Sequence, residues 1–240
     1  MAGRYFKLLK DTLMAGINLL IPPVCLGCHE SLLDAESILC PSCQVRIKLI
    51  SPNGCPKCGL ALEDGVCPAC SEFKYDFDRS HSVFYYESPL TDLIHNLKYR
   101  EHTRGAGFLA SGMAAFVNND AHYKQSDYIT AVPLHAVRKR ERGYNQSELI
   151  ARRIAKLTGI KYIKAVKRRR YTASQTMLHK DQRLHNLQGA FRAYPNKSLN
   201  GKQIILVDDV FTTGSTLNEI SKSLHQAGAA KVLGLTACRA

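Results

Sequence analysis

The most distinctive chemistry in this sequence lies in its cysteines, eight of which form four Cys-x-x-Cys pairs. The pairs are Cys25/Cys28, Cys40/Cys43, Cys55/Cys58 and Cys67/Cys70. Each pair presents two thiolates on a tight turn, and two such turns complete a tetrahedral four-cysteine shell for Zn²⁺. The sequence therefore predicts two structural zinc ions. Sequential pairing requires the shortest loops, and a cross-braced arrangement fits the same spacing. A disulfide framework would need an oxidising compartment, to which nothing in the sequence directs the chain.

A second group of candidate residues follows an apolar run near the C-terminus. Residues 204–207 predict a buried strand, and Asp208 and Asp209 come directly after it. The next residues form a turn rich in hydroxyls and glycine that opens a helix: Thr212, Thr213, Gly214, Ser215 and Thr216. The backbone N–H groups of such a turn, with the helix N-terminus, form a cradle for a phosphate. Ionised aspartates accept hydrogen bonds from sugar hydroxyls, so the segment indicates a sugar-phosphate site.

Basic side chains are concentrated in one part of the chain. Residues 137–192 carry 16 Lys and Arg against 3 Asp and Glu, which equals the net charge of +13 of the whole chain. This excess indicates a phosphorylated small molecule or nucleic acid as partner, and a solvated basic face is the alternative. One basic segment follows a predicted strand and holds Pro133, Leu134, His135, Arg138, Arg140 and Arg142. The other holds the candidates for nucleic-acid phosphates, Lys167, Arg168, Arg169 and Arg170.

Alternating strands and helices are expected to position these groups. The patterns predict strands at 81–86, 127–132, 162–166, 203–207 and 231–236, and helices at 90–99, 108–117, 144–158 and 215–226. Leu149, Ile150, Ile154 and Leu157 are expected to face the core. This alternation predicts an α/β fold, a parallel sheet flanked by helices with ligands at the carboxyl ends of the strands. The polar stretch 168–190 has the length of a functional loop.

Three segments divide the chain: a lead-in helix at 1–24, a double zinc ribbon at 25–75 and the α/β domain at 80–240. The apolar run 13–24 is too short to span a bilayer and ends in two prolines. No transmembrane segment or signal peptide is therefore expected. The expected location is the cytoplasm, with a peripheral position at the inner membrane as the alternative.

Residues 204–216 closely resemble the 5-phosphoribosyl-1-pyrophosphate (PRPP) signature of type I phosphoribosyltransferases. The resemblance implies that Asp208 and Asp209 hold the ribose hydroxyls and that Thr212–Thr216 hold the 5′-phosphate, with Mg²⁺ accompanying PRPP. It also implies that the segment 133–142 is a loop that binds pyrophosphate. The stretch 168–190 corresponds to the family's mobile catalytic loop. The candidates for catalysis are Arg142, Gln175 and Arg183. Purine-salvage members carry a carboxylate where this chain has Thr212, so a 6-oxopurine acceptor is not expected.

Nearly the full chain is similar to the ComF family. The matching features are the cysteine pairs, Lys98 in Leu97-Lys98-Tyr99, the segment 142–146, Gln175, the segment 183–186 and the PRPP loop. This resemblance implies a competence protein that handles incoming single-stranded DNA in natural transformation. PRPP or another 5-phosphoribosyl ligand, single-stranded DNA and DNA-uptake proteins are the partners it implies.

Two further hypotheses fit the same residues. One is an active, Mg-PRPP-dependent phosphoribosyltransferase with an unidentified acceptor, and the other is a PRPP-responsive regulator. The sequence contains no recognisable helix-turn-helix segment, which disfavours the regulator. Candidate stacking partners for bases in the DNA hypothesis are Tyr144, Tyr162, Tyr171 and Phe191.

Overall fold

A computed structural model of the chain describes residues 22–32, 34, 36–99, 103–170, 187–194 and 199–240. The expected lead-in helix at 1–24 therefore lies almost wholly outside the described residues. Among the helices that the structure describes, none is both long and apolar enough to cross a bilayer.

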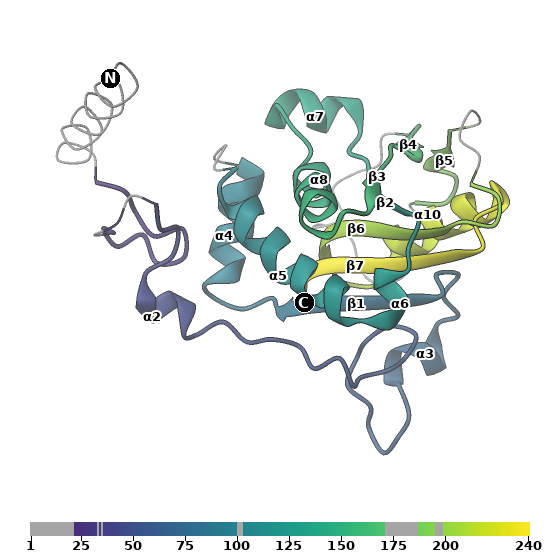
Figure 1. The fold of residues 1–240 in the computed structure, drawn as a ribbon, viewed down its shortest axis with the longest axis horizontal. Coiled ribbons are helices and arrows are strands. Elements are labelled where there is room, and N and C mark those ends of the chain that lie inside the picture. The colour runs from purple at the N-terminus through teal and green to yellow at the C-terminus, as the bar shows by residue number, and fades with distance from the viewer. Residues whose placement is uncertain (1–21, 33, 35, 100–102, 171–186, 195–198) are drawn as a thin grey trace.

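The centre of the molecule is a five-stranded sheet (Figure 1). Its strands are β1 (Arg79–Tyr85), β2 (Tyr128–Ala131), β3 (Lys161–Tyr162), β6 (Gln203–Phe211) and β7 (Lys231–Arg239). They lie in the order β1-β7-β6-β2-β3, and every neighbouring pair is parallel. The predicted parallel α/β sheet is confirmed.

Helices cover both faces of this sheet (Figure 1). They are α4 (Leu90–Tyr99), α5 (Gly105–Asn119), α6 (Ala121–Lys124), α7 (Ala136–Arg142), α8 (Gln146–Thr158) and α10 (Ser215–Gln226). Side chains of β6 alternate between two cores, as a strand requires. Ile205 and Val207 pack with the residues of α4, α5 and α8, whereas Ile204 and Leu206 pack with those of α10.

The structure differs from the sequence prediction around the basic segments. The strand expected at 162–166 is divided: β3 ends at Tyr162, and β4 (Val166–Arg168) pairs antiparallel with β5 (Phe191–Ala193) in a separate two-stranded ribbon. The segment expected as a loop after β2 contains α7, because His135 caps its first turn and Gly143, with φ of 74°, ends it. Basic side chains there project from a helix rather than from a loop.

Two smaller differences concern element ends. β6 continues to Phe211, so Asp208 and Asp209 lie within the strand instead of after it, with Asp208 opposite Thr236 of β7. Leu157, expected in the core, is 53% exposed. The helical period places Leu157 on the correct side of α8, and the last turn of that helix extends past the packed core.

The eight paired cysteines form two clusters that precede the sheet. The first cysteine cluster comprises Cys25, Cys28, Cys40 and Cys43, and the second comprises Cys55, Cys58, Cys67 and Cys70. Each cluster includes one short helix, α2 (Pro41–Gln44) or α3 (Pro68–Glu72). The first cluster packs with the core of α4, α5 and α8, and the second packs with that of α10. The first cysteine cluster lies beside α4, and the second lies next to β1, the edge strand of the sheet (Figure 1).

Candidate functional site

Each cysteine cluster has the donor set of a structural zinc site. Within a cluster, the four sulfur atoms lie within 4.8 Å of one another, and the clusters combine cysteines that are neighbours in sequence. The sequential pairing is therefore the one found. None of these cysteines is in a disulfide. In the part of the chain that the structure describes, the grouped ligand atoms of each cluster are cysteine sulfurs alone, and four convergent thiolates make a closed shell that holds a metal and does not activate water.

Backbone amides and one arginine support the thiolates of the first cysteine cluster. The amides of Gly27 and Cys40 donate to Cys25 Sγ at 3.4 and 3.2 Å. Arg46 donates to Cys43 Sγ at 3.0 Å. These donors stabilise negative sulfur, so the residues present fit Zn²⁺.

The second cysteine cluster is tied directly to the C-terminal part of the sheet. Arg239, at the end of β7, donates to the carbonyl of Cys58 at 2.7 Å. Its guanidinium lies 4.4 Å from the ring centre of Phe211 at the end of β6. A few residues after the cluster, the hydroxyl of Tyr75 donates to the carbonyl of Thr213 at 3.2 Å. The cluster therefore braces the turn that follows β6.

That turn, residues 212–216, leads from β6 into α10. Gly214 has φ of 74° and caps α10, and an added Cβ there would lie only 2.7 Å from Phe211 and 3.0 Å from Tyr75. The Thr213 hydroxyl donates to Ser215 Oγ at 3.0 Å. Thr212 is exposed and Thr216 is half-buried. The turn thus places backbone amides and hydroxyls at a helix N-terminus, a geometry suited to an anion.

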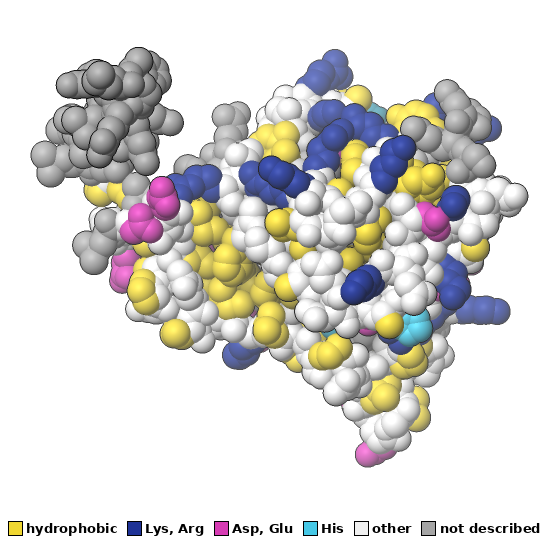
Figure 2. Space-filling view, in the orientation of Figure 1, with side chains coloured by type: hydrophobic (Ala, Val, Ile, Leu, Met, Phe, Trp, Pro, Cys, Tyr) yellow, Lys and Arg dark blue, Asp and Glu magenta, His cyan; other side chains and the backbone are white. Residues whose placement is uncertain are grey.

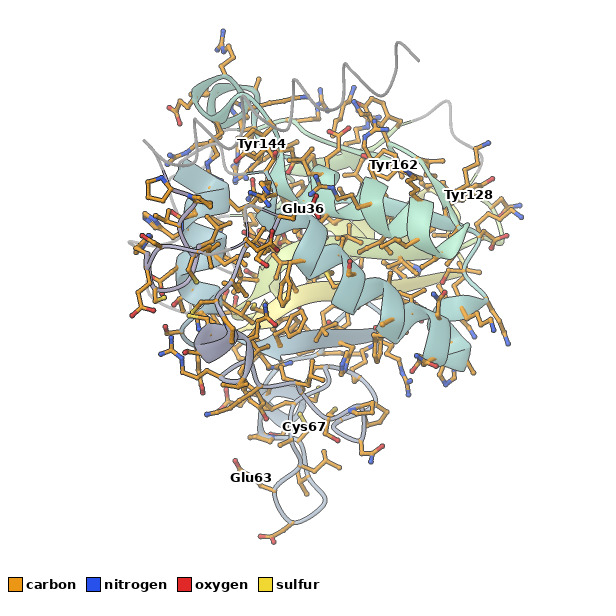
Figure 3. All side chains as sticks on the ribbon, turned by 60° about the vertical axis from the view of Figure 1, so that its left-hand side comes forward. Glu36, Glu63, Cys67, Tyr128, Tyr144 and Tyr162 are labelled. Carbon is orange, nitrogen blue, oxygen red and sulfur yellow. The ribbon has the colours of Figure 1, made fainter. Side chains whose placement is uncertain are left out.

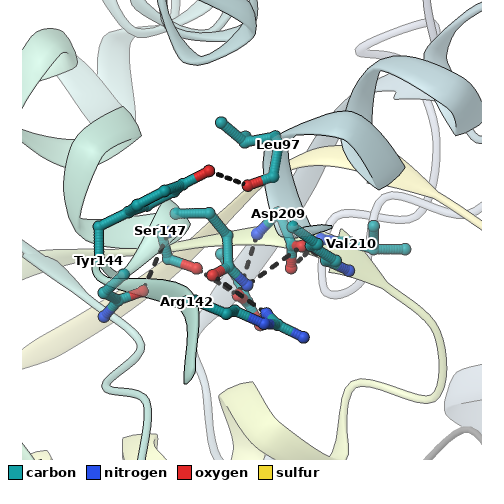
Figure 4. Close-up of polar contacts among 10 residues, drawn as sticks. Leu97, Arg142, Tyr144, Ser147, Asp209 and Val210 are labelled. Atoms are coloured by element: carbon teal, nitrogen blue, oxygen red, sulfur yellow. Dashed lines mark hydrogen bonds and ion pairs between the residues drawn. The ribbon is translucent and has the colours of Figure 1, made fainter. Parts of the chain in front are cut away.

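The two aspartates meet side chains from α4 and α8 at the carboxyl end of β6 (Figure 4). Ser147 donates to Asp208 Oδ1 at 2.8 Å. Asp209 is 6% exposed, and its Oδ2 lies 2.6 Å from the ammonium of Lys98 and 3.5 Å from the amide nitrogen of Gln146. Each aspartate also accepts a backbone N–H, from Asp209 at 2.9 Å and from Val210 at 3.0 Å respectively.

Burial and charge drive the pKa values of these two carboxyls apart. Burial, followed by the neighbouring charge of Asp209, raises the pKa of Asp208 to about 8. Burial acts in the same direction on Asp209, but the Lys98 ammonium outweighs it and the pKa of Asp209 is lowered. Burial likewise opposes charging of Lys98, and Asp209 nevertheless keeps the pKa of that lysine raised. The site therefore contains an ionised Asp209 paired with a charged Lys98, beside a carboxyl that protonates readily.

The start of α8 is held in place by hydrogen bonds on both sides. Asn145 caps the helix by accepting from the Ser147 amide at 3.1 Å, and donates to the carbonyl of Val132 at 2.9 Å. Tyr144 donates to the carbonyl of Leu97 on α4. Arg142 donates to Gln146 at 3.3 Å. The end of β2, the end of α4 and the start of α8 are thereby joined around the aspartates.

A separate basic pocket of about 230 Å³ opens between α7, the start of α8 and the β4–β5 ribbon. Its charged lining residues are Lys139, Glu148, Lys164, Lys167 and Arg168, and its aromatic ones are Tyr162 and Tyr194. The three lysines are exposed. Lys and Arg side chains gather over α7 on the face shown in Figure 2. Tyr144 and Tyr162 lie far from Cys67 of the second cysteine cluster (Figure 3).

The structure brings together some of the predicted site residues and separates others. The aspartates and the 212–216 turn lie on consecutive segments, and α7, which carries Arg138, Arg140 and Arg142, lies near the basic pocket. Lys167 and Arg168 line that pocket, whereas Arg169 and Arg170 are exposed beyond it. Gln175, Arg183 and Tyr171 lie outside the described residues.

Sequence reasoning missed Ser147 and Tyr75 as neighbours of the site. Ser147 follows the motif Asn145-Gln146, and its position in the first turn of α8 was the available signal. No sequence signal pointed to Tyr75, because 138 residues separate it from Thr213, whose carbonyl it contacts. Lys98 was noted only as part of a family pattern, with no role.

Two family models match the chain. Residues 16–72 match the double zinc ribbon domain, and residues 109–239, more than half of the chain, match the phosphoribosyl transferase domain. The zinc ribbon prediction and the fold prediction are confirmed.

Several known proteins are similar to the chain over most of its length. "DNA utilization protein YhgH" of Escherichia coli K12 is 32% identical, covering 92% of this chain and 99% of the relative. "Competence protein F" of Haemophilus influenzae is 33% identical, covering 87% and 93%. Among solved structures, a glutamine PRPP amidotransferase from B. subtilis is 22% identical, covering 54% of this chain and 26% of that one, with a TM-score of 0.37.

Proposed function

The chain belongs to the ComF family, together with competence protein F and DNA utilization protein YhgH, and on this basis we propose that it handles incoming single-stranded DNA in the cytoplasm while binding a 5-phosphoribosyl ligand beside β6. The proposal has two parts, a sugar-phosphate site and a nucleic-acid surface. Each rests on a different set of residues and has its own test.

The arrangement at the carboxyl end of β6 carries the first part. Asp208 and Asp209 lie in the carboxyl-terminal part of β6, near the edge of the sheet where ligands bind in parallel folds. The 212–216 turn follows β6 at the N-terminus of α10. Sugar hydroxyls donate to carboxylates, and a phosphate accepts from the amides and hydroxyls of the turn. A ligand with a ribose ring and a 5′-phosphate satisfies both groups at once.

The basic pocket supports the second part. Its three lysines surround a cavity of about 230 Å³, smaller than the roughly 300 Å³ at which pockets for drug-sized ligands begin. Such a cavity suits a small anionic group such as one phosphate of a nucleic-acid backbone. Tyr162 is half-buried beneath Arg152, whose guanidinium lies 4.4 Å from the ring centre, and Tyr194 lies 5.4 Å from Lys167 Nζ. Cations for phosphates beside aromatic faces for bases are the combination that single strands require.

Titration calorimetry with ribose 5-phosphate tests the first part. The wild type should bind, and Asp208→Asn with Asp209→Asn should weaken binding at least tenfold. The ionised Asp209 makes charge-assisted hydrogen bonds, which contribute about 1.5–3 kcal/mol each, and the change at Asp208 removes a further acceptor oxygen. Asp127→Asn is the matched control. This aspartate accepts from Lys202 and from the Gln203 amide, at the opposite ends of the strands. Equal binding by the double variant and the wild type would contradict the site.

Salt-dependent binding of a single-stranded oligonucleotide tests the second part. Changing Lys139, Lys164 and Lys167 to Gln should reduce the slope of log affinity against log salt by about 2, since each phosphate contact on a single strand contributes roughly 0.7. The control variant carries Gln at Lys48, Lys202 and Lys222, which are exposed and lie outside the pocket. An equal change in both variants would mean that general charge, not the pocket, attracts DNA.

A phosphoribosyltransferase activity is a second candidate, favoured by the β4–β5 ribbon. The ribbon returns the chain to the same place after residues 169–190, since the Arg169 amide donates to the carbonyl of Ala190 at 2.8 Å. The family resemblance places the catalytic loop between these two residues, and residues 171–186 of that stretch lie outside the part of the chain that the structure describes. The test measures pyrophosphate release from PRPP in the presence of each candidate acceptor. Release with one of them would identify a phosphoribosyltransferase, and no release with any of them would indicate that the protein binds the ligand without transferring it.

A further inference from the structure

The carboxylate of Asp209 already has a cation of its own. Lys98 Nζ lies 2.6 Å from Asp209 Oδ2, and the two side chains are 23% and 8% exposed. The other oxygen of Asp209 accepts the Val210 amide at 3.0 Å. An ammonium at this distance is in direct contact, so no second cation can occupy the same side of that oxygen.

The fold holds Lys98 at this position. The residue lies in the last turn of α4, and the carbonyl before it, that of Leu97, accepts the hydroxyl of Tyr144. Leu97 itself is fully buried. The Tyr144 hydrogen bond therefore joins the end of α4 to the residues just before α8. Helices α4 and α8 lie on one face of the sheet, and Lys98 extends from α4 to Asp209.

Magnesium fits this arrangement poorly at Asp209. Mg²⁺ requires near-octahedral oxygen ligands at about 2.0–2.1 Å and is usually held by one or two carboxylates together with substrate phosphates. Asp209 Oδ2 instead contacts the Lys98 ammonium, with Gln146 as a further donor at 3.5 Å. Asp208 Oδ1 accepts from Ser147 and from the Asp209 amide. The chain itself therefore supplies the cation beside Asp209 and the hydrogen-bond donors beside Asp208.

We propose that Lys98 is the resident cation of this site, so that the chain binds a 5-phosphoribosyl ligand without a divalent cation on Asp209. Lys98 is then a positioning residue: it keeps Asp209 ionised and oriented so that its remaining lone pairs accept the ribose hydroxyls. The inference rests on the proposed sugar-phosphate site. The family resemblance implies Mg²⁺ that accompanies PRPP, and in this arrangement such an ion would have to bind through oxygens of the ligand and not on Asp209.

The charge of Lys98 distinguishes this proposal from a purely structural role. Lys98→Met preserves most of the length of the side chain and removes its charge, which leaves Asp209 as an unpaired buried carboxylate able to recruit a metal. Lys202→Met is the matched control, since Lys202 pairs with Asp127 at 2.9 Å at the amino ends of β2 and β6. Lys98→Gln combined with Asp209→Asn removes both charges and should recruit no metal.

The first measurement uses no phosphoribosyl ligand. Mn²⁺ binding, followed by electron paramagnetic resonance in chelator-free buffer, and thermal unfolding with and without Mn²⁺ are compared for all four proteins. Lys98→Met should take up one additional Mn²⁺ and regain thermal stability with it. The wild type, the Lys202→Met control and the double variant should not. Identical Mn²⁺ uptake by Lys98→Met and the wild type would overturn the proposal.

The second measurement is titration calorimetry with ribose 5-phosphate in the presence and absence of Mg²⁺. The wild-type affinity should change by less than about twofold, whereas Lys98→Met should lose roughly tenfold without Mg²⁺ and recover with it. A wild type that binds only with Mg²⁺ would refute the resident cation, and this arm decides the matter even if Lys98→Met does not fold. If no protein binds ribose 5-phosphate under any condition, the sugar-phosphate site fails, and the Mn²⁺ result still reports on Lys98.

Discussion

Replacing Gly214 with alanine should destabilise the protein at the 212–216 turn for two separable reasons. The first is backbone strain, because φ is 74° at this glycine and an L-residue there is disfavoured by about 1–2 kcal/mol. The second is crowding. The added Cβ would lie 2.7 Å from Phe211 Cζ and 3.0 Å from Tyr75 Cε1, closer than van der Waals contact allows.

The two rings have little freedom to move away from the new methyl group. Tyr75 stacks on Phe77 with ring centres 4.7 Å apart and donates to Thr213. Phe211 lies beneath the guanidinium of Arg239 and meets Phe77 edge-on at 6.3 Å. Overpacking of this kind costs about 1–3 kcal/mol. Together with the backbone term, Gly214→Ala should lower the free energy of unfolding by roughly 2–5 kcal/mol.

Urea unfolding of Gly214→Ala and Gly159→Ala, with zinc content verified, separates the two contributions. Gly159 has a similar φ of 78° at the end of α8, and nothing lies within 4 Å of its added Cβ. It should therefore show only the backbone cost of about 1–2 kcal/mol. Equal losses in the two variants would refute the argument that the aromatic side chains fix the turn. If the turn binds phosphate, Gly214→Ala should also bind ribose 5-phosphate more weakly than Gly159→Ala does.

Two further predictions concern the metal and the pH dependence of stability. Cys58→Ser removes one thiolate of the second cysteine cluster, so it should lower the zinc content measured by mass spectrometry from two ions to one per chain. Cys238 is a buried cysteine outside both clusters, and the control variant Cys238→Ser should retain two ions. Burial lowers the pKa of His81 to about 4, below its unfolded value, so the stability that it contributes is complete above pH 6.5 and is lost as the pH falls toward 4. His81→Phe, which can still stack on Phe116, should reduce the loss of unfolding free energy over this interval by at most about 3 kcal/mol, and an unchanged pH dependence would exclude His81 as its source.

The sequence by itself determined the features that depend on short-range patterns. The Cys-x-x-Cys spacing identified the eight metal donors, since each pair forms its own turn and two pairs complete a tetrahedron, whereas the structure showed which pairs share a site. The limits of α10 agree with the prediction at both ends, because its apolar side chains recur at helical spacing after a turn-forming glycine. The alternation of strands and helices likewise required a parallel sheet, whose carboxyl edge is where ligands bind.

Tertiary structure alone decided what surrounds the candidate site. The contact of Ser147 with Asp208 spans 61 residues and that of Tyr75 with Thr213 spans 138, and no local period encodes either one. The partner of Asp209 became known only from the tertiary structure, in which the end of α4, bonded to Tyr144 through the Leu97 carbonyl, places Lys98 2.6 Å from Asp209. The local sequence pattern determines whether a residue lies in a helix or a strand and which side of that element its side chain is on. Its charge state and its contacts depend on which distant segments pack beside it.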